Sequence, residues 1–379
     1  MSAAGTGLKP LVALPASARQ QLLHGLKHPE VLAHEGLLSW NAVLREARAA
    51  NLVARLAHVI EQAGLDASVP APVRPHLLAA RRLSQHQHDA IRWECRHLAQ
   101  ALGDLQIPVV LLKGSAYVMG DLMASRGRLF GDVDILVPRP HLNRVEAALR
   151  LHGWSAGAVD PYDDRYYRRW MHELPPFVHL KRGTALDVHH NILPLSAADV
   201  PQPQTILDRS EQLPNSPLRV PSREDLVIHS AVHLFHEGET VHALRDLLDL
   251  ESLCDQFAQA DPRFWGRLVA RARELRLVWP VCLALRYLAG VLQMHIPGNV
   301  QDELREGAGV GRLRMAALDR LYRHAFLDSR SSPSAPAASL ARGILYLRGH
   351  ALRMPLHLLA LHLARKGLLR LFKSNSRSA

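Results

Sequence analysis

The stretch RLFGDVDILVPR, residues 128–139, places two aspartates inside an otherwise apolar run. Without them it is typical of a buried β-strand, because branched apolar residues continue to Val137 and Pro138 then ends the run. Side chains alternate between the two faces of a strand, so Asp132 and Asp134 point to the same side. The sequence therefore predicts a buried strand that carries two neighbouring carboxylates on one face.

Two neighbouring carboxylates repel each other, and removing them from water costs several kcal/mol unless a cation compensates. Mg²⁺ accepts oxygen ligands and binds one or two carboxylates together with substrate phosphates. A third acid on a neighbouring strand would complete a site for two such ions, and Asp187 in TALDVHHNI, residues 184–192, is the candidate. In the alternative interpretation Asp132 and Asp134 flank a turn and are solvated, which the apolar residues 135–137 oppose.

The sequence before this strand predicts a turn that binds phosphate. IPVVLLKGS, residues 107–115, is a short apolar run that ends in glycine and serine, and a short helical pattern follows it. Backbone N–H groups at the start of a helix bind phosphate, so Gly114 and Ser115 are candidate ligands, and Lys113 adds a positive charge. The tripeptide alone is common, and the order of the motifs along the chain carries more information than any one of them.

With its motifs in this order, the sequence resembles the nucleotidyltransferase superfamily of the DNA polymerase β type. Within that superfamily it is similar to the bacterial group of uncharacterised nucleotidyltransferases. The LLKG lead-in, GDVDILV and LDVHH carry the likeness to this group, which covers about residues 75–260.

The resemblance implies a Mg²⁺-dependent enzyme that moves an NMP group from an NTP such as ATP to an acceptor hydroxyl and releases pyrophosphate. Two Mg²⁺ ions held by the three aspartates would bridge the triphosphate and help to activate the acceptor. Residues 113–115 would hold the β- and γ-phosphates. Arg126 and Arg128, just before the strand, would neutralise phosphate charge or lie in a solvated loop. The acceptor stays open between a protein, an RNA and a small molecule.

Further polar residues are expected near this site. His229, His233 and His236 share one face of a helix, where they would bind zinc, or pack as a polar face over the sheet, or touch the nucleotide. His189 lies on the same strand face as the third aspartate, and Glu173 is a reserve acid. Residues 245–249, RDLLD, are expected to form an ion pair in a supporting role.

The patterns around the central motifs predict an α+β protein with a small mixed sheet flanked by helical regions. Helical periodicity before and after the motifs separates the chain into an N-terminal helical region, the nucleotidyltransferase core, a helical domain that covers the cleft, a linker, and a basic amphipathic tail. These are residues 1–74, 75–221, 222–327, 328–340 and 341–379.

Local signals place individual elements. Ser39 is positioned to cap a helix, and Ser222 with Asp225 has the capping-box spacing at the start of another. The pair Arg182-Gly183 between two apolar runs predicts a hairpin.

Composition limits the class of protein. The chain has 379 residues, 48% of them hydrophobic, a net charge of +11, and three cysteines without metal or redox spacing. We therefore expect a folded cytoplasmic protein in a reducing compartment, with a tail that could contact the anionic surface of the inner membrane. The charge also suits a polyanion partner, so an RNA-binding module is one alternative. A non-catalytic nucleotide sensor or partner-binding protein on the same fold is the other.

Overall fold

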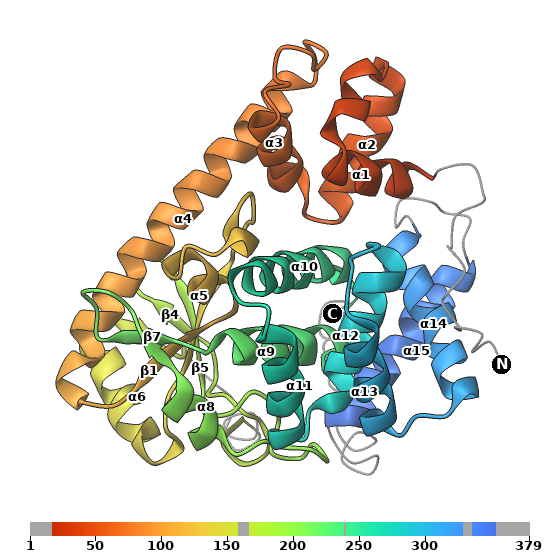
Figure 1. The fold of residues 1–379 in the computed structure, drawn as a ribbon. Coiled ribbons are helices and arrows are strands. Elements are labelled where there is room, and N and C mark those ends of the chain that lie inside the picture. Colours follow the sequence, from red (N-terminus) through yellow and green to blue (C-terminus); the bar gives the residue numbers. More distant parts are fainter. Residues whose placement is uncertain (1–16, 158–166, 239, 329–335, 354–379) are drawn as a thin grey trace, which may run out of the picture.

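A computed structural model of the chain describes residues 17–157, 167–238, 240–328 and 336–353. It contains a mixed seven-stranded sheet with the strand order β3-β4-β5-β2-β1-β7-β6. Most helices that follow the sheet in the sequence lie to one side of it, at the right in Figure 1, and the first helices of the chain lie above. The α+β class and the mixed sheet predicted from the sequence are confirmed.

The strands are short, and the middle three position the acids. Their bounds are β1 (Val109–Leu112), β2 (Asp132–Leu136), β3 (Trp154–Ser155), β4 (Phe177–His179), β5 (Ala185–His189), β6 (Glu211–Gln212) and β7 (Leu218–Val220). Strand β2 is antiparallel to β1 and parallel to β5. In this register Asp134 lies opposite Leu112 on one side and opposite Asp187 on the other. The two motifs that the sequence separates by about fifty residues are thus neighbours in the sheet.

The helices form three groups along the chain. Before the sheet come α1 (Ala18–Lys27), η1 (Pro29–His34), α2 (Leu37–Ala49), α3 (Val53–Gln62), α4 (Arg74–Leu102) and η2 (Gly103–Leu105). Between strands lie α5 (Lys113–Met119), η3 (Met123–Ser125), η4 (Arg139–His141), α6 (Leu142–Leu151) and α8 (Pro203–Arg209). After the sheet follow α9 (Arg223–His236), α10 (Ala243–Ala260), α11 (Phe264–Glu274), α12 (Val278–Val291), α13 (Gly298–Ala308), α14 (Arg312–Leu327) and α15 (Pro336–Arg353).

Two of the three local signals work as predicted. Ser222 caps α9, and its side chain accepts a hydrogen bond from the backbone N–H of Asp225. Strands β4 and β5 form the expected antiparallel hairpin, and Gly183 adopts the left-handed backbone that its turn requires, with φ +71°.

The prediction that Ser39 caps a helix is wrong. Gly36 occupies the N-cap of α2, so Ser39 lies inside the first turn. Trp40 explains the earlier start, because its buried ring packs in the core and its Nε1 donates to the carbonyl of Leu32. Tertiary packing of the first turn outweighs the capping preference of a single serine.

The last described helix, α15, begins at Pro336, inside the predicted linker, and packs against α9 and α14. Its buried stripe is narrow, with the small residues Ala338, Ala341 and Gly349. A Cβ atom at Gly349 would lie 2.5 Å from the Cα of Gly238, so the helix crosses the end of α9 backbone to backbone. Most of the predicted linker and residues 354–379 of the predicted tail lie outside the described residues.

In the described part of the chain, none of the helices combines the length and the apolar character needed to span a membrane.

Candidate active site

Three carboxylates converge at the edge of the sheet where β1 ends and β2 begins. The side-chain oxygens of Asp132, Asp134 and Asp187 lie within 4.8 Å of one another. Asp132 and Asp134 share a strand face because they are two residues apart, and Asp187 pairs with Asp134 across the parallel ladder. The convergence that the sequence predicts is therefore present in the structure.

The three acids differ in burial and in charge. Asp134 is only 2% exposed, whereas Asp187 is half-buried and Asp132 is the most exposed. Burial, together with the negative charge of Asp134, raises the pKa of Asp187 to about 7 and raises the pKa of Asp132 above its ordinary value. The site thus holds negative charge that its own residues only partly compensate.

Asp134 is the acid that keeps its charge. Its Oδ1 accepts from Lys113 Nζ at 3.1 Å and lies 3.0 Å from His189 Nε2. Burial alone would raise the pKa of Asp134, but Lys113 and His189 outweigh it and hold the pKa well below the usual range. The same contacts raise the pKa of Lys113 and of His189 although burial lowers both. These three side chains form a buried ion cluster beneath the more exposed acids.

Lys113, which contacts Asp134, has an unusual backbone conformation. It stands at the junction of β1 and α5 with φ +46°, in the left-handed region that side chains other than glycine rarely adopt. The chain turns from strand to helix in one residue there. Such strained positions cluster at functional sites, where the surrounding structure holds them in place.

His189 connects the acids to a second group. Its Nδ1 lies 3.4 Å from Glu173 Oε2, while its Nε2 faces Asp134. His172 packs against the His189 ring with centroids 5.2 Å apart, and potential ligand atoms of His172, Glu173 and His189 lie within 4.8 Å of one another. His189 and Glu173 therefore lie near the acids, as expected, and His189 orients the Asp134 carboxylate from one side.

The glycine and serine of the predicted phosphate turn lie in the first turn of α5, and both are buried. A Cβ at Gly114 would lie 2.1 Å from the ring of Phe130, so any larger residue would force that ring to move. The Ser115 hydroxyl donates to the carbonyl of Leu112 at 2.8 Å and to that of Asp134 at 3.3 Å. Both residues thus join α5 to the strands, and their contact with phosphate stays a prediction.

Arg128 is buried and faces acids of α10. Its guanidinium forms ion pairs with Asp246 and Asp249, and burial lowers the pKa of Arg128 to about 10. Asp246 also pairs with Arg245, which is the ion pair expected in residues 245–249. Arg55 of α3 donates to Asp249 at 2.9 Å. In this structure Arg128 links the loop before β2 to the helices, and its contact with phosphate stays a prediction.

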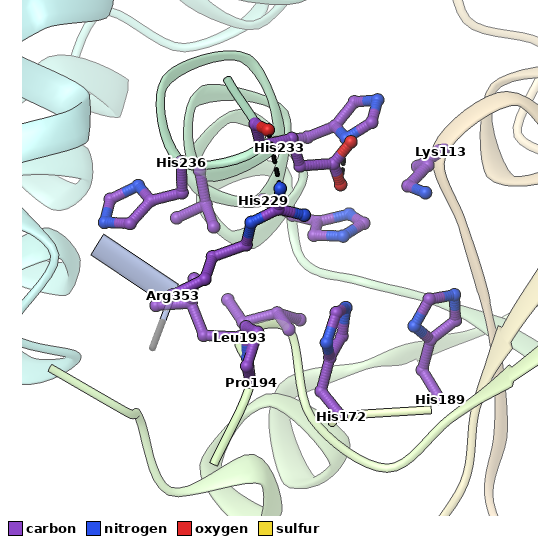
Figure 2. Close-up of a pocket in the computed structure, with 12 residues that line it drawn as sticks. Lys113, His172, His189, Leu193, Pro194, His229, His233, His236 and Arg353 are labelled. Carbon is purple, nitrogen blue, oxygen red and sulfur yellow. Dashed lines mark hydrogen bonds and ion pairs between the residues drawn. The ribbon is translucent and has the colours of Figure 1, made fainter. Parts of the chain in front are cut away.

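A narrow pocket opens beside the acids, between α9 and the segment that follows β5 (Figure 2). Most of its polar lining consists of nitrogen groups: Lys113, His172, His189, His229, His233, His236 and Arg353 face a single carboxylate, that of Glu237. His233 is ion-paired with Glu237, and Arg353 Nη2 donates to the Glu237 carbonyl at 2.8 Å.

Two of the α9 histidines, His229 and His236, are neutral packing groups of this pocket. Burial lowers the pKa of His229 to about 3 and that of His236 to about 4, assisted by neighbouring cations. Neither of the two groups of potential metal ligands in the described part of the chain includes them. The arrangement fits the expected polar face over the sheet better than a zinc site.

Two contributors to the site were not found by sequence reasoning. Glu237 follows the last residue of α9, and Arg353 ends α15. The sequence placed His172, which directly precedes Glu173, near the hairpin that leads to Asp187. Glu237 and Arg353 become neighbours through the crossing of α15 over α9, which no local pattern reveals.

Comparison with known proteins agrees with this geometry. A family model described as "uncharacterised nucleotidyltransferase" matches residues 37–293, from the start of α2 to just past the end of α12, and the match includes all three acids. No curated protein and no solved structure matches the chain. The chain therefore belongs to the family of uncharacterised nucleotidyltransferases and is an enzyme of that class.

Proposed function

We propose that the protein is a Mg²⁺-dependent nucleotidyltransferase of the DNA polymerase β type, which moves an NMP group from an NTP to an acceptor hydroxyl. The observation that carries the proposal is the convergence of Asp132, Asp134 and Asp187 at one sheet edge. The order of elements supports the superfamily, with a Gly-Ser helix after the first strand, an Asp-Xaa-Asp strand, and a third acid on the strand beside it.

The donor set suits magnesium. All three ligands are carboxylate oxygens, which Mg²⁺ prefers, and neither cysteine nor histidine belongs to this group. The raised pKa values of Asp132 and Asp187 mark a place where a cation would relieve repulsion. When bound, Mg²⁺ would neutralise phosphate charge and stabilise the entering and leaving oxygens of the displacement.

The residues around the acids have distinct roles in this proposal. Asp187, with a pKa of about 7 before metal binds, is placed to accept the proton of the acceptor hydroxyl. Lys113 supplies positive charge to the triphosphate next to Asp134. His189, held between Asp134 and Glu173, fixes the orientation of the buried carboxylate. Pyrophosphate is the leaving group.

Label transfer tests this function. The full-length protein is incubated with each α-³²P-labelled NTP and a cell extract, with Mg²⁺ or with EDTA, and protein, RNA and small-molecule fractions are examined for label. We expect one fraction to acquire label only with Mg²⁺. Asp132→Asn should reduce the initial rate by at least about a hundredfold, because removing one of the carboxylates proposed to hold Mg²⁺ disables the site as a whole.

Asp121→Asn is the matched control, since Asp121 is an exposed acid that pairs with Arg126 and lies outside the group of three. Transfer that survives Asp132→Asn unchanged would refute the assigned site. Mg²⁺-dependent nucleotide binding without transfer to any fraction would instead favour the non-catalytic nucleotide sensor.

We also propose a cytoplasmic protein whose terminal segment contacts anionic membrane. The support is sequence alone, because residues 354–379 contain Lys and Arg but no Asp or Glu, on an amphipathic pattern. Sedimentation with vesicles that contain anionic lipid tests it. A version that lacks residues 354–379 and still binds vesicles as strongly as the full chain would disprove the role of this segment.

A further inference from the structure

A second cavity, of about 310 Å³, lies between α3 and α4. Ala54, His58 and Glu61 form one wall and are spaced at one face of α3, and residues 81–88 of α4 form the other. Arg126 and the residue after it close one end. Cavities that bind small molecules begin at about this size.

The groove is basic. Three arginines line it, namely Arg81, Arg82 and Arg126, against the single carboxylate of Glu61. His58 and His88 also line it, and burial lowers the pKa of both, so they offer neutral ring nitrogens. The arginines at positions 81 and 126 are held by carboxylates at 2.8–3.3 Å.

Two of the basic residues are available to a ligand. Within the described residues, Arg82 and His58 form neither a hydrogen bond nor an ion pair. They project from opposite walls, Arg82 from α4 and His58 from α3. The groove thus presents nitrogen donors from two sides, and this arrangement favours a compact anion over a neutral ligand.

The groove is joined to the catalytic strand through one loop. Ser84 Oγ donates to the carbonyl of Arg128 at 3.1 Å, and His88 Nε2 lies 3.3 Å from the same oxygen. Two residues later, the backbone N–H of Phe130 donates to the side chain of Gln87 at 2.9 Å. The α4 wall therefore holds the segment that leads directly into Asp132.

The α3 wall also packs closely against the loop before β2. Gly127 has φ +64°, and a Cβ there would lie 2.5 Å from the Cα of Arg55 in α3. The loop is thus clamped between both helices that form the groove. A ligand that draws α3 and α4 together would act on the loop that positions β2.

We propose that this groove is a binding site for a phosphorylated small molecule, separate from the acids that serve the donor nucleotide. The ligand is recognised through its phosphate by Arg82 and His58, with Arg81 and Arg126 adding positive charge. Two available donors in a cavity of this size suit a phosphate or diphosphate group. A nucleic-acid backbone would need a longer basic track.

Isothermal titration of pyrophosphate into the full-length protein tests the site. EDTA is present and NTP is absent, so the result does not depend on nucleotidyl transfer or on metal at the acids. We expect saturable binding, with Arg82→Gln and His58→Gln each weakening the affinity at least about fivefold. Arg96→Gln, an exposed residue of α4 outside the groove, is the control with the same loss of charge.

Circular dichroism and the unfolding midpoint show that each variant is folded before it is titrated. The proposal is overturned if wild type shows no saturable binding, or if both groove variants bind as wild type does. It is also overturned if Arg96→Gln weakens binding as much as Arg82→Gln, because attraction would then be non-specific.

Discussion

Buried titratable groups are charged on one side of the candidate active site and neutral on the other. On the sheet side, Asp134 stays ionised at 2% exposure because Lys113 and His189 contact it. On the α9 side, His229 and His236 stay neutral because burial dominates and the nearby charges are mostly positive. Burial removes charge from any side chain, and only a partner of opposite sign within contact distance preserves it.

The largest expected effect is on stability, when the charged group on the sheet side of the site is removed. Asp134→Asn removes the charge that compensates His189 and Lys113, and we expect the free energy of unfolding to fall by about 3 kcal/mol. Asp132→Asn, on the same strand face but exposed, should change it by less than about 0.5 kcal/mol. Urea denaturation of both variants measures the contrast. Equal losses would show that Asp134 is not the charged centre of the cluster.

A smaller effect tests the turn that joins β1 to α5. In Gly114→Ala the new methyl group meets the Phe130 ring, and we expect a loss of about 1–3 kcal/mol in the free energy of unfolding. Phe130→Ala in the same chain should recover part of that loss, which a double-mutant cycle measures. Gly131→Ala is the control, because nothing lies within 4 Å of a Cβ there. Additive losses would contradict the contact.

The smallest effect concerns the α9 side and depends on pH. Burial and then Arg348 and Arg353 lower the pKa of His236 to about 4, so between about pH 6.5 and pH 4 the unfolded chain binds a proton that the folded chain does not. Stability contributed by this group is complete above pH 6.5 and falls with decreasing pH, by at most about 1.4 kcal/mol per pH unit.

Urea denaturation at pH 7, 6 and 5 measures this slope in wild type and in His236→Gln. The variant should show a shallower decline over the same interval. Identical slopes would mean that the pKa of His236 is the same in the folded and the unfolded chain.

The features that follow from local rules could be predicted from the sequence. Strand periodicity placed Asp132 and Asp134 on one face, and the order of the motifs indicated Asp187 as the acid of a neighbouring strand. The same parity placed His189 beside Asp187. These predictions needed only the alternation of side chains in strands and the order of the motifs.

The features that depend on packing between distant segments could not be predicted. Arg128 precedes the strand of the two aspartates, and its ion pairs with acids of α10 were not expected from the sequence. Arg353 enters the pocket from a helix near the end of the chain. Nothing in the spacing of either arginine indicates its partner, because the partner is chosen by how the helices pack.

Because α15 crosses α9, the part of the chain that builds the pocket extends beyond the part that the family model covers. The region that defines the family ends at residue 293, yet Arg348 and Arg353 of α15 are hydrogen-bond donors to the carbonyls of Phe235 and Glu237. A fragment cut at the family boundary would keep every acid and leave those carbonyls without these donors, beside a pocket with one wall missing. The pocket beside the acids is therefore built from more of the chain than the family model covers.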